Sequence, residues 1–197
     1  MSEHDRQRWN DKYNNRAIPA HLHVDDWLVE RMANSHPGRA LDLACGLGHN
    51  AIWLKRQGWN VDALDISPVG LELAQRFADQ QSGHVNWMCA DLEEPFLETR
   101  PELKSAYDLI VVFRFLDRIH LPRLIPQLLK PGGKLIYETF TSGQLQRADN
   151  HLRDPNFLLQ PGELPQLYSS LTVIEYEEVT LSDRCVARLD AELQGRN

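Results

Sequence analysis

Short apolar runs alternate with amphipathic segments along most of the chain. Residues 39 to 44 form one such run, which predicts a first strand, and the closely spaced glycines after it precede a helix that we expect to end near Gly58. The segment "NVDALD" predicts a second strand ending at Asp65, and Ser67 followed by Pro68 is typical of a helix start. This order of elements indicates a βαβ unit.

The same alternation continues toward the C-terminus. Strands are predicted at "HVNWMCAD", "YDLIVVF" and "GKLIYETF", with a helix between the last two that Pro126 should kink or shorten. The segments "LTVIEYEEVTL" and "RCVARLDAEL" predict two neighbouring strands with a turn at Ser182 and Asp183. We therefore expect an α/β fold, a Rossmann-like, doubly wound, mostly parallel sheet of about seven strands that ends in an antiparallel hairpin.

The length of 197 residues, 42% of them hydrophobic, suits a single domain. We expect four parts in it: N-terminal cover helices over 1–36, a cofactor-binding core over 37–140, a lid or substrate loop over 141–170, and a strand pair over 171–197. The loop is predicted from its polar composition and its length. His151 and Arg153 on this loop are hypothesised to contribute to the substrate site.

Composition and charge limit the classes of partner that we expect. The net charge of −7 disfavours nucleic acid, and no apolar stretch reaches the roughly 18 residues that a membrane span needs. Three scattered cysteines form no zinc-binding spacing and indicate a reducing compartment. The pair His21 and His23 lacks a third ligand of suitable spacing, so no metal is expected. These features predict a cytoplasmic protein, and they leave its oligomeric state open.

The glycine-containing turn after the first strand is a candidate cofactor site. Gly46, Gly48 and Ala51 satisfy the pattern G-x-G-x-x-[G/A], and Asp65 ends the second strand where an acid would bond ribose hydroxyls. Backbone N–H groups at a helix start can bind a pyrophosphate. Taken alone, this pattern is compatible with a dinucleotide such as NAD.

Two further acids change the expected cofactor. Asp42, inside the first strand, would repel a pyrophosphate but attract an ammonium group. Asp91 ends the third strand, where it can accept a hydrogen bond from an adenine amine. The chain also has no room for a separate substrate domain. These features favour a cationic adenosyl amino acid, S-adenosylmethionine.

Five segments carry a family resemblance. In order and spacing, "LDLACGLGHNAIWL", "VDALDIS", "CADLEE", "YDLIVV" and "LLKPGGKLIYETF" resemble the motifs of class I S-adenosylmethionine-dependent methyltransferases. Within that superfamily, "RWNDKY" and "ETF" resemble the bacterial tellurite-resistance and thiopurine-methyltransferase group. One position departs from the family: Ala44 stands where a first glycine is common, and we expect alanine to tolerate the strand-end conformation.

The resemblance implies a role for each candidate. Gly46 and Gly48 would let the backbone approach the methionine half, Asp42 would hold its ammonium group, Asp65 the ribose, and Asp91 with Leu92 the adenine. Trp9 and Tyr13 share a helix face and would either pack that helix onto the domain or exclude water as a lid. The cofactor-binding candidates are Asp42, Ala44, Gly46, Gly48, Asp65, Ile66, Asp91, Leu92, Phe113, Trp9 and Tyr13.

Catalytic candidates follow the fourth and fifth strands, where open α/β sheets place their ligands. Arg114 could anchor an anionic substrate or pair with Asp117. A thiol or a chalcogen oxyanion would need no strong base, whereas an oxygen or nitrogen nucleophile would use Glu138 or His120.

The sequence therefore predicts a methyltransferase for a small-molecule acceptor, with S-adenosylmethionine as cofactor. Two alternatives remain open. One is a fragment of an NAD-dependent oxidoreductase, and the other is a non-catalytic module that binds S-adenosylmethionine or S-adenosylhomocysteine.

Overall fold

A computed structural model describes residues 3–15, 22–80, 84–95, 99–150, 152 and 154–195. The chain divides into two compact units, Met1–Leu103 and Lys104–Asn197. The hypothesised substrate residues His151 and Arg153, and His21 of the histidine pair, lie outside the described residues.

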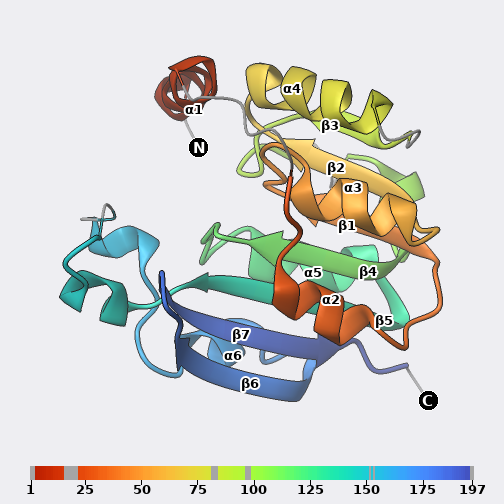
Figure 1. Cartoon of the computed structure of the whole chain (residues 1–197). Helices are drawn as coiled ribbons and strands as arrows, with labels where there is room; N and C mark the ends of the chain where they lie inside the picture. Colours follow the sequence, from red (N-terminus) through yellow and green to blue (C-terminus); the bar gives the residue numbers. More distant parts are fainter. Residues whose placement is uncertain are drawn as a thin grey trace. The chain divides into compact units, whose positions relative to one another are not determined.

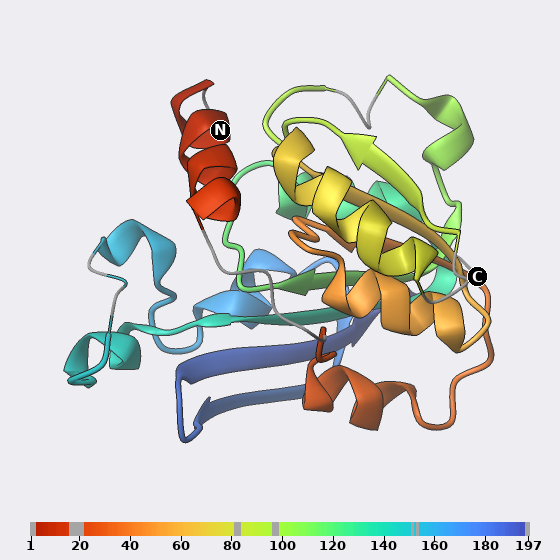
Figure 2. The ribbon, with the colours of Figure 1, turned by 45° about the horizontal axis from the view of Figure 1, so that its top comes forward.

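The first unit contains the predicted βαβ arrangement. Strands β1 (Arg39–Leu43), β2 (Asn60–Asp65) and β3 (Asn86–Cys89) are parallel, with β2 in the middle. Helices α3 (His49–Arg56) and α4 (Pro68–Asp79) pack on the same face of these strands (Figures 1 and 2). The predicted start of α4 is confirmed, because the Ser67 hydroxyl accepts a hydrogen bond from the Gly70 N–H at 3.0 Å.

Two helices precede the first strand, as the sequence predicts. Helix α1 (Glu3–Asn15) lies beside the first turn of α4 (Figure 2), and α2 (Asp26–Met32) follows it in the chain. Tyr13 is the buried side chain of α1, whereas α2 buries Trp27, Leu28 and Met32. Because α1 buries so little apolar surface, its position depends on specific contacts.

The second unit carries the antiparallel end of the sheet. Strand β4 (Tyr107–Phe113) pairs in parallel with β5 (Leu129–Phe140), β7 (Cys185–Glu192) runs antiparallel to β5, and β6 (Thr172–Thr180) pairs antiparallel with β7. The complete strand order is β3-β2-β1-β4-β5-β7-β6. The predicted fold class, a Rossmann-like mixed sheet of seven strands with a C-terminal hairpin, is confirmed.

The helix predicted between β4 and β5 is present in the second unit. Helix α5 (Leu121–Leu128) keeps Pro126 inside it, because only two turns precede β5 and the proline deprives few carbonyls of a partner. The short helices η2 (Ser142–Gln146), η3 (Pro155–Phe157) and α6 (Glu163–Leu167) complete this unit, whereas η1 (Pro101–Leu103) belongs to the first unit. Helices α5 and α6 lie behind the strands of this unit in Figure 1.

The polar stretch over 141–170 has a structured second half. Leu158, Leu159, Leu164 and Tyr168 are fully buried there, so this part packs into the core of the second unit. The lid or substrate loop expected over 141–170 stays a prediction. No helix among the described residues combines the length and apolarity that crossing a membrane requires.

Candidate functional site

The turn between β1 and α3 is held in an unusual backbone conformation. Ala44, Gly46 and Gly48 have φ values of 56°, 57° and 74°, so every second residue is left-handed. The Cys45 N–H donates to the Leu64 carbonyl at 3.0 Å, which ties the turn to β2. A turn of this kind can direct successive N–H groups into one concavity, so it can surround a polar ligand group.

Ala44 is strained in this conformation. The sequence predicts a strand-end conformation for Ala44, whereas its φ of 56° is left-handed. A left-handed φ brings the alanine Cβ close to the following carbonyl oxygen. Glycine would avoid this strain, which explains why a glycine is common at this position in the family that the sequence resembles.

Ala44→Gly is expected to stabilise the protein by about 0.5–1 kcal/mol, since relief of left-handed strain exceeds the added entropy of the unfolded chain. The free energy of unfolding, measured by urea denaturation, checks this. Ala51→Gly, inside α3, is the control and should instead destabilise by about 1 kcal/mol or more. Destabilisation by Ala44→Gly would contradict the strain that we assign to this residue.

Asp65 caps the same turn from the end of β2. Its carboxylate accepts hydrogen bonds from the Gly46 N–H at 2.8 Å and from the Ser67 N–H at 2.9 Å. Burial raises the pKa of this carboxyl, and the bonds from Ser67, Gly46 and Ile66 oppose the rise. A carboxylate has about four lone-pair sites, so Asp65 retains the capacity to accept a further hydrogen bond from a ligand.

The other two predicted acids are also buried at strand ends. Asp42 accepts a hydrogen bond from the Ala51 N–H at 3.0 Å, and Asp91 accepts one from the Glu93 N–H at 2.9 Å. Their exposed fractions are 2% and 4%. Ile66 and Leu92, which follow Asp65 and Asp91 in the chain, are buried as well. The first unit thus gathers three carboxylates whose chemistry suits a cation and hydroxyl donors.

Tyr13 packs into a notch between two glycines. A Cβ built on Gly46 would lie 2.8 Å from the Tyr13 hydroxyl, and one on Gly70 would lie 2.8 Å from the edge of its ring. The Ser67 hydroxyl also donates a hydrogen bond to the Asn10 side chain at 2.6 Å. Helix α1 is therefore docked directly on the glycine turn and on the start of α4.

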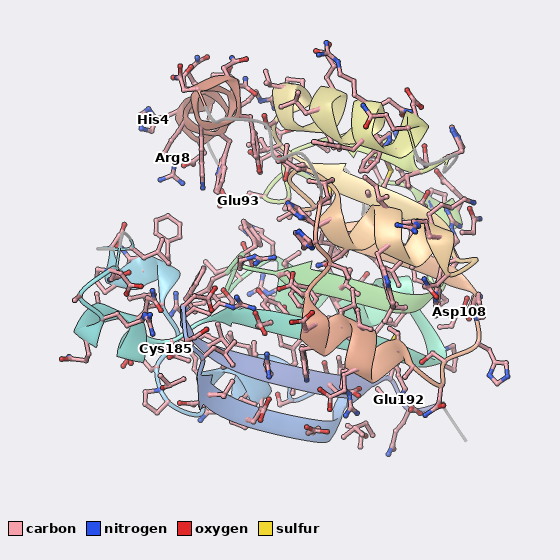
Figure 3. All side chains as sticks on the ribbon, viewed as in Figure 1. His4, Arg8, Glu93, Asp108, Cys185 and Glu192 are labelled. Atoms are coloured by element: carbon pink, nitrogen blue, oxygen red, sulfur yellow. The ribbon has the colours of Figure 1, made fainter. Side chains whose placement is uncertain are left out.

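Trp9 and Tyr13 share one face of α1, as predicted. Their rings stack with centroids 5.8 Å apart. His4 and Arg8 project from α1 on the side away from α4 (Figure 3). Tyr13 thus lies against the glycine turn, whereas Trp9 packs against the Tyr13 ring and the Lys12 ammonium, which is 4.1 Å from the Trp9 ring centroid.

Three residues of the first unit were missed by the sequence reasoning. Asn10 and Gly70 fix α1, while Trp87 packs on Gly48, where a Cβ would lie 2.5 Å from its ring. None of these contacts has a local sequence signal, because each joins segments distant in the chain. The G-x-G pattern predicted the turn but not the side chains that require glycine there.

Glu138 in the second unit is enclosed by arginines. Its carboxylate is fully buried and accepts hydrogen bonds from the Nε atoms of Arg184 at 3.2 Å and Arg188 at 2.8 Å. Arg188 also pairs with Glu177 at 2.9 Å. This cross-strand network gives Glu138 a structural function and leaves it no exposed atom with which to reach an acceptor. Of the two predicted bases, Glu138 is therefore the less suitable.

His120 has the surroundings of a general base. Its Nδ1 lies 2.9 Å from the Asp117 carboxylate, which also accepts hydrogen bonds from the N–H groups of Ile119, His120 and Leu121. Burial alone would raise the pKa of Asp117, but these bonds together lower it, so the carboxylate stays charged. A charged partner at Nδ1 favours the tautomer with its proton there and leaves Nε2 to accept one. The imidazole is 35% exposed, which keeps it accessible.

Arg114 lies at the carboxyl end of β4, directly after the buried Phe113. Its φ of 58° is left-handed, and its N–H donates to the Glu138 carbonyl at 2.8 Å. The side chain is exposed. Strained non-glycine residues are found preferentially at functional sites, which supports the prediction that this residue contacts a substrate.

Comparison with known proteins gives a family and several relatives. A family model described as a methyltransferase domain matches residues 17–176. Hemagglutinin 1 of Eikenella corrodens is 31% identical over 158 residues, covering 77% of this chain and 49% of that protein. The ubiquinone biosynthesis O-methyltransferase of Coxiella burnetii is 30% identical over 115 residues, covering 56% of this chain and 47% of that enzyme. The chain thus spans about half the length of these curated relatives.

The fold also matches solved structures. TehB from Haemophilus influenzae has a TM-score of 0.70 and 20% sequence identity, with 96% of this chain and 67% of that one covered. A structure described under the conversion of a disulfide bond into a thioacetal group during echinomycin biosynthesis has a TM-score of 0.77 and 16% identity, with 97% and 93% covered. At these identities, the likeness is one of fold.

Proposed function

Since this chain belongs to the methyltransferase domain family, we propose that it transfers a methyl group from S-adenosylmethionine to a small-molecule acceptor. One observation carries the proposal. In the first unit, a left-handed turn over residues 44–48 is capped by the buried Asp65 carboxylate, beside Asp42 and Asp91 at neighbouring strand ends. These carboxylates suit the ammonium, ribose hydroxyls and adenine amine of this cofactor, whereas a pyrophosphate would be repelled.

The first unit would hold the cofactor. Asp65 would bond the ribose through the lone-pair capacity that its three backbone bonds leave, Asp42 would attract the ammonium group, and Asp91 would accept a hydrogen bond from the adenine amine. Trp9 and Tyr13 would cover the site and exclude water. The cofactor, when bound, supplies an electrophilic methyl group on a sulfonium, so the protein mainly needs to align the nucleophile in a dry site.

The second unit would handle the acceptor. His120, oriented by Asp117, would take the proton of an acceptor hydroxyl at Nε2 as the nucleophile forms. Arg114 would contact an anionic group of the acceptor. We therefore place a hydroxyl compound first among acceptors. A thiol or a chalcogen oxyanion, which the resemblance to the tellurite-resistance group implies, remains the second candidate because it needs no base.

Calorimetric titration of the purified protein with S-adenosylmethionine, S-adenosylhomocysteine and NAD tests the cofactor. We expect saturable binding of the first two and none of NAD. Binding of NAD alone would contradict the proposal and favour an oxidoreductase.

Formation of S-adenosylhomocysteine across a panel of catechols, thiols and chalcogen oxyanions tests turnover. Turnover with catechols supports a base-assisted reaction, and turnover restricted to thiols or oxyanions supports the second acceptor class. Tight cofactor binding without turnover of any acceptor would instead indicate a binding module.

A further inference from the structure

Arg118 joins two segments of the second unit that lie far apart in the chain. Its guanidinium bonds both carboxylate oxygens of Glu163, and it also donates to the carbonyls of Asn156 at 2.6 Å and Leu158 at 2.9 Å. We call this arrangement the Arg118 clamp. The bond from Arg118 lowers the pKa of Glu163, so the pair is charged at neutral pH. The clamp fixes the loop before α5 to the segment that contains η3.

Two large apolar side chains beside the clamp are exposed. Ile119 follows Arg118 directly and is 58% exposed, and Phe157 lies between the two carbonyls that Arg118 binds and is 39% exposed. The next residue after Ile119 is His120, whose imidazole is oriented by Asp117. The Arg118 clamp thus joins the segment that carries His120 and Ile119 to the segment that carries Phe157.

We infer that Ile119 and Phe157 bind the apolar part of the acceptor, and that the acceptor is an amphipathic hydroxyl compound bearing an alkyl or aryl substituent. This inference rests on the proposed function, in which His120 takes the hydroxyl proton. Single exposed apolar residues are common on protein surfaces. These two differ because they flank the four-bond contact of Arg118, which precedes His120 by two residues and bonds the carbonyls on both sides of Phe157.

The clamp explains why such a surface would bind well. When a ligand has to order a flexible loop, the entropy lost by the loop weakens binding. A loop that is already fixed before binding does not lose this entropy. Arg118 and Glu163 are therefore positioning residues, and Ile119 and Phe157 make the contact. Each methylene of the acceptor buried on them should raise affinity about fourfold.

A chain-length series tests the inference. The probes are catechol and its 4-methyl, 4-ethyl and 4-butyl derivatives, titrated calorimetrically against the whole protein with S-adenosylhomocysteine present. The dissociation constant of the wild-type protein should fall about fourfold per methylene over the first members. The same series is then followed for S-adenosylhomocysteine formation with S-adenosylmethionine.

Variants assign the effect to particular side chains. Ile119→Ser and Phe157→Ser should each reduce the gain to about twofold per methylene or less, without changing affinity for unsubstituted catechol. Leu145→Ser is the matched control, because Leu145 is 45% exposed in η2 and should leave the gain unchanged. Glu163→Gln should reduce the gain in affinity per methylene while leaving the affinity for unsubstituted catechol unchanged. An unfolded variant would instead lose its affinity for catechol as well.

The outcomes separate this inference from the proposed function. A steep series that the serine variants flatten, with turnover of the same compounds, supports both. A flat wild-type series, no binding of any catechol, or a slope unchanged in the serine variants overturns the inference even if other acceptors are methylated. A steep series without methylation overturns the assignment of these compounds as acceptors. Absence of cofactor binding overturns the proposed function itself.

Discussion

Asp65→Ala is expected to weaken S-adenosylmethionine binding by at least a hundredfold. Two effects combine, because the variant loses the proposed bonds to the ribose and also releases the Gly46 and Ser67 N–H groups that the carboxylate now caps. A hydrogen bond to a charged group contributes about 1.5–3 kcal/mol, and a hundredfold change corresponds to about 2.7 kcal/mol. Calorimetric titration of the variant measures the loss.

Two further variants make the Asp65 result interpretable. Asp79→Ala removes an exposed carboxylate from the end of α4 and should bind the cofactor like the wild-type protein. Asp65→Asn keeps one acceptor oxygen and should lose less affinity than the alanine variant. If Asp65→Ala retained full affinity while folded, as judged by circular dichroism, the proposed ribose contact would be wrong.

His120→Ala is expected to lower kcat for hydroxyl acceptors by about 10²–10⁴-fold while leaving cofactor affinity unchanged. General-base catalysis contributes factors of this size, and every cofactor-binding candidate except Phe113 lies in the first unit, whereas His120 belongs to the second. Steady-state kinetics with a catechol, together with a cofactor titration of the same variant, check both parts of the prediction.

The acceptor itself provides a control for His120. A thiol acceptor that ionises in solution should be methylated at nearly the wild-type rate by His120→Ala, because it needs no base. His36→Ala changes an exposed histidine outside both groups of candidates and should alter neither rate. An unchanged kcat with catechol in His120→Ala would show that the imidazole is not the base.

Local sequence patterns were sufficient for most of the fold. The strand and helix periods, the Ser67 cap and the turn at Ser182 depend on residues close together in the chain, and the structure confirms each of them. The Asp117–His120 pair has a similar local basis, since a carboxylate three residues before a histidine at a helix start is visible in the sequence.

Contacts between distant segments decided the rest. Glu138 could be interpreted as a base until folding placed it 2.8 Å from the Arg188 Nε, 50 residues away in the chain. The strain at Ala44 likewise depends on how β1 leaves the sheet, which periodicity does not encode.

The sequence by itself determined the strands, their order along the chain and the family, because hydrophobic period and motif spacing are properties of neighbouring residues. The tertiary structure alone decided that Tyr13 fills the notch between Gly46 and Gly70 and that Arg118 clamps the loop carrying His120. Such partners are chosen by packing and by the need to pair buried polar groups, which only the folded chain can satisfy.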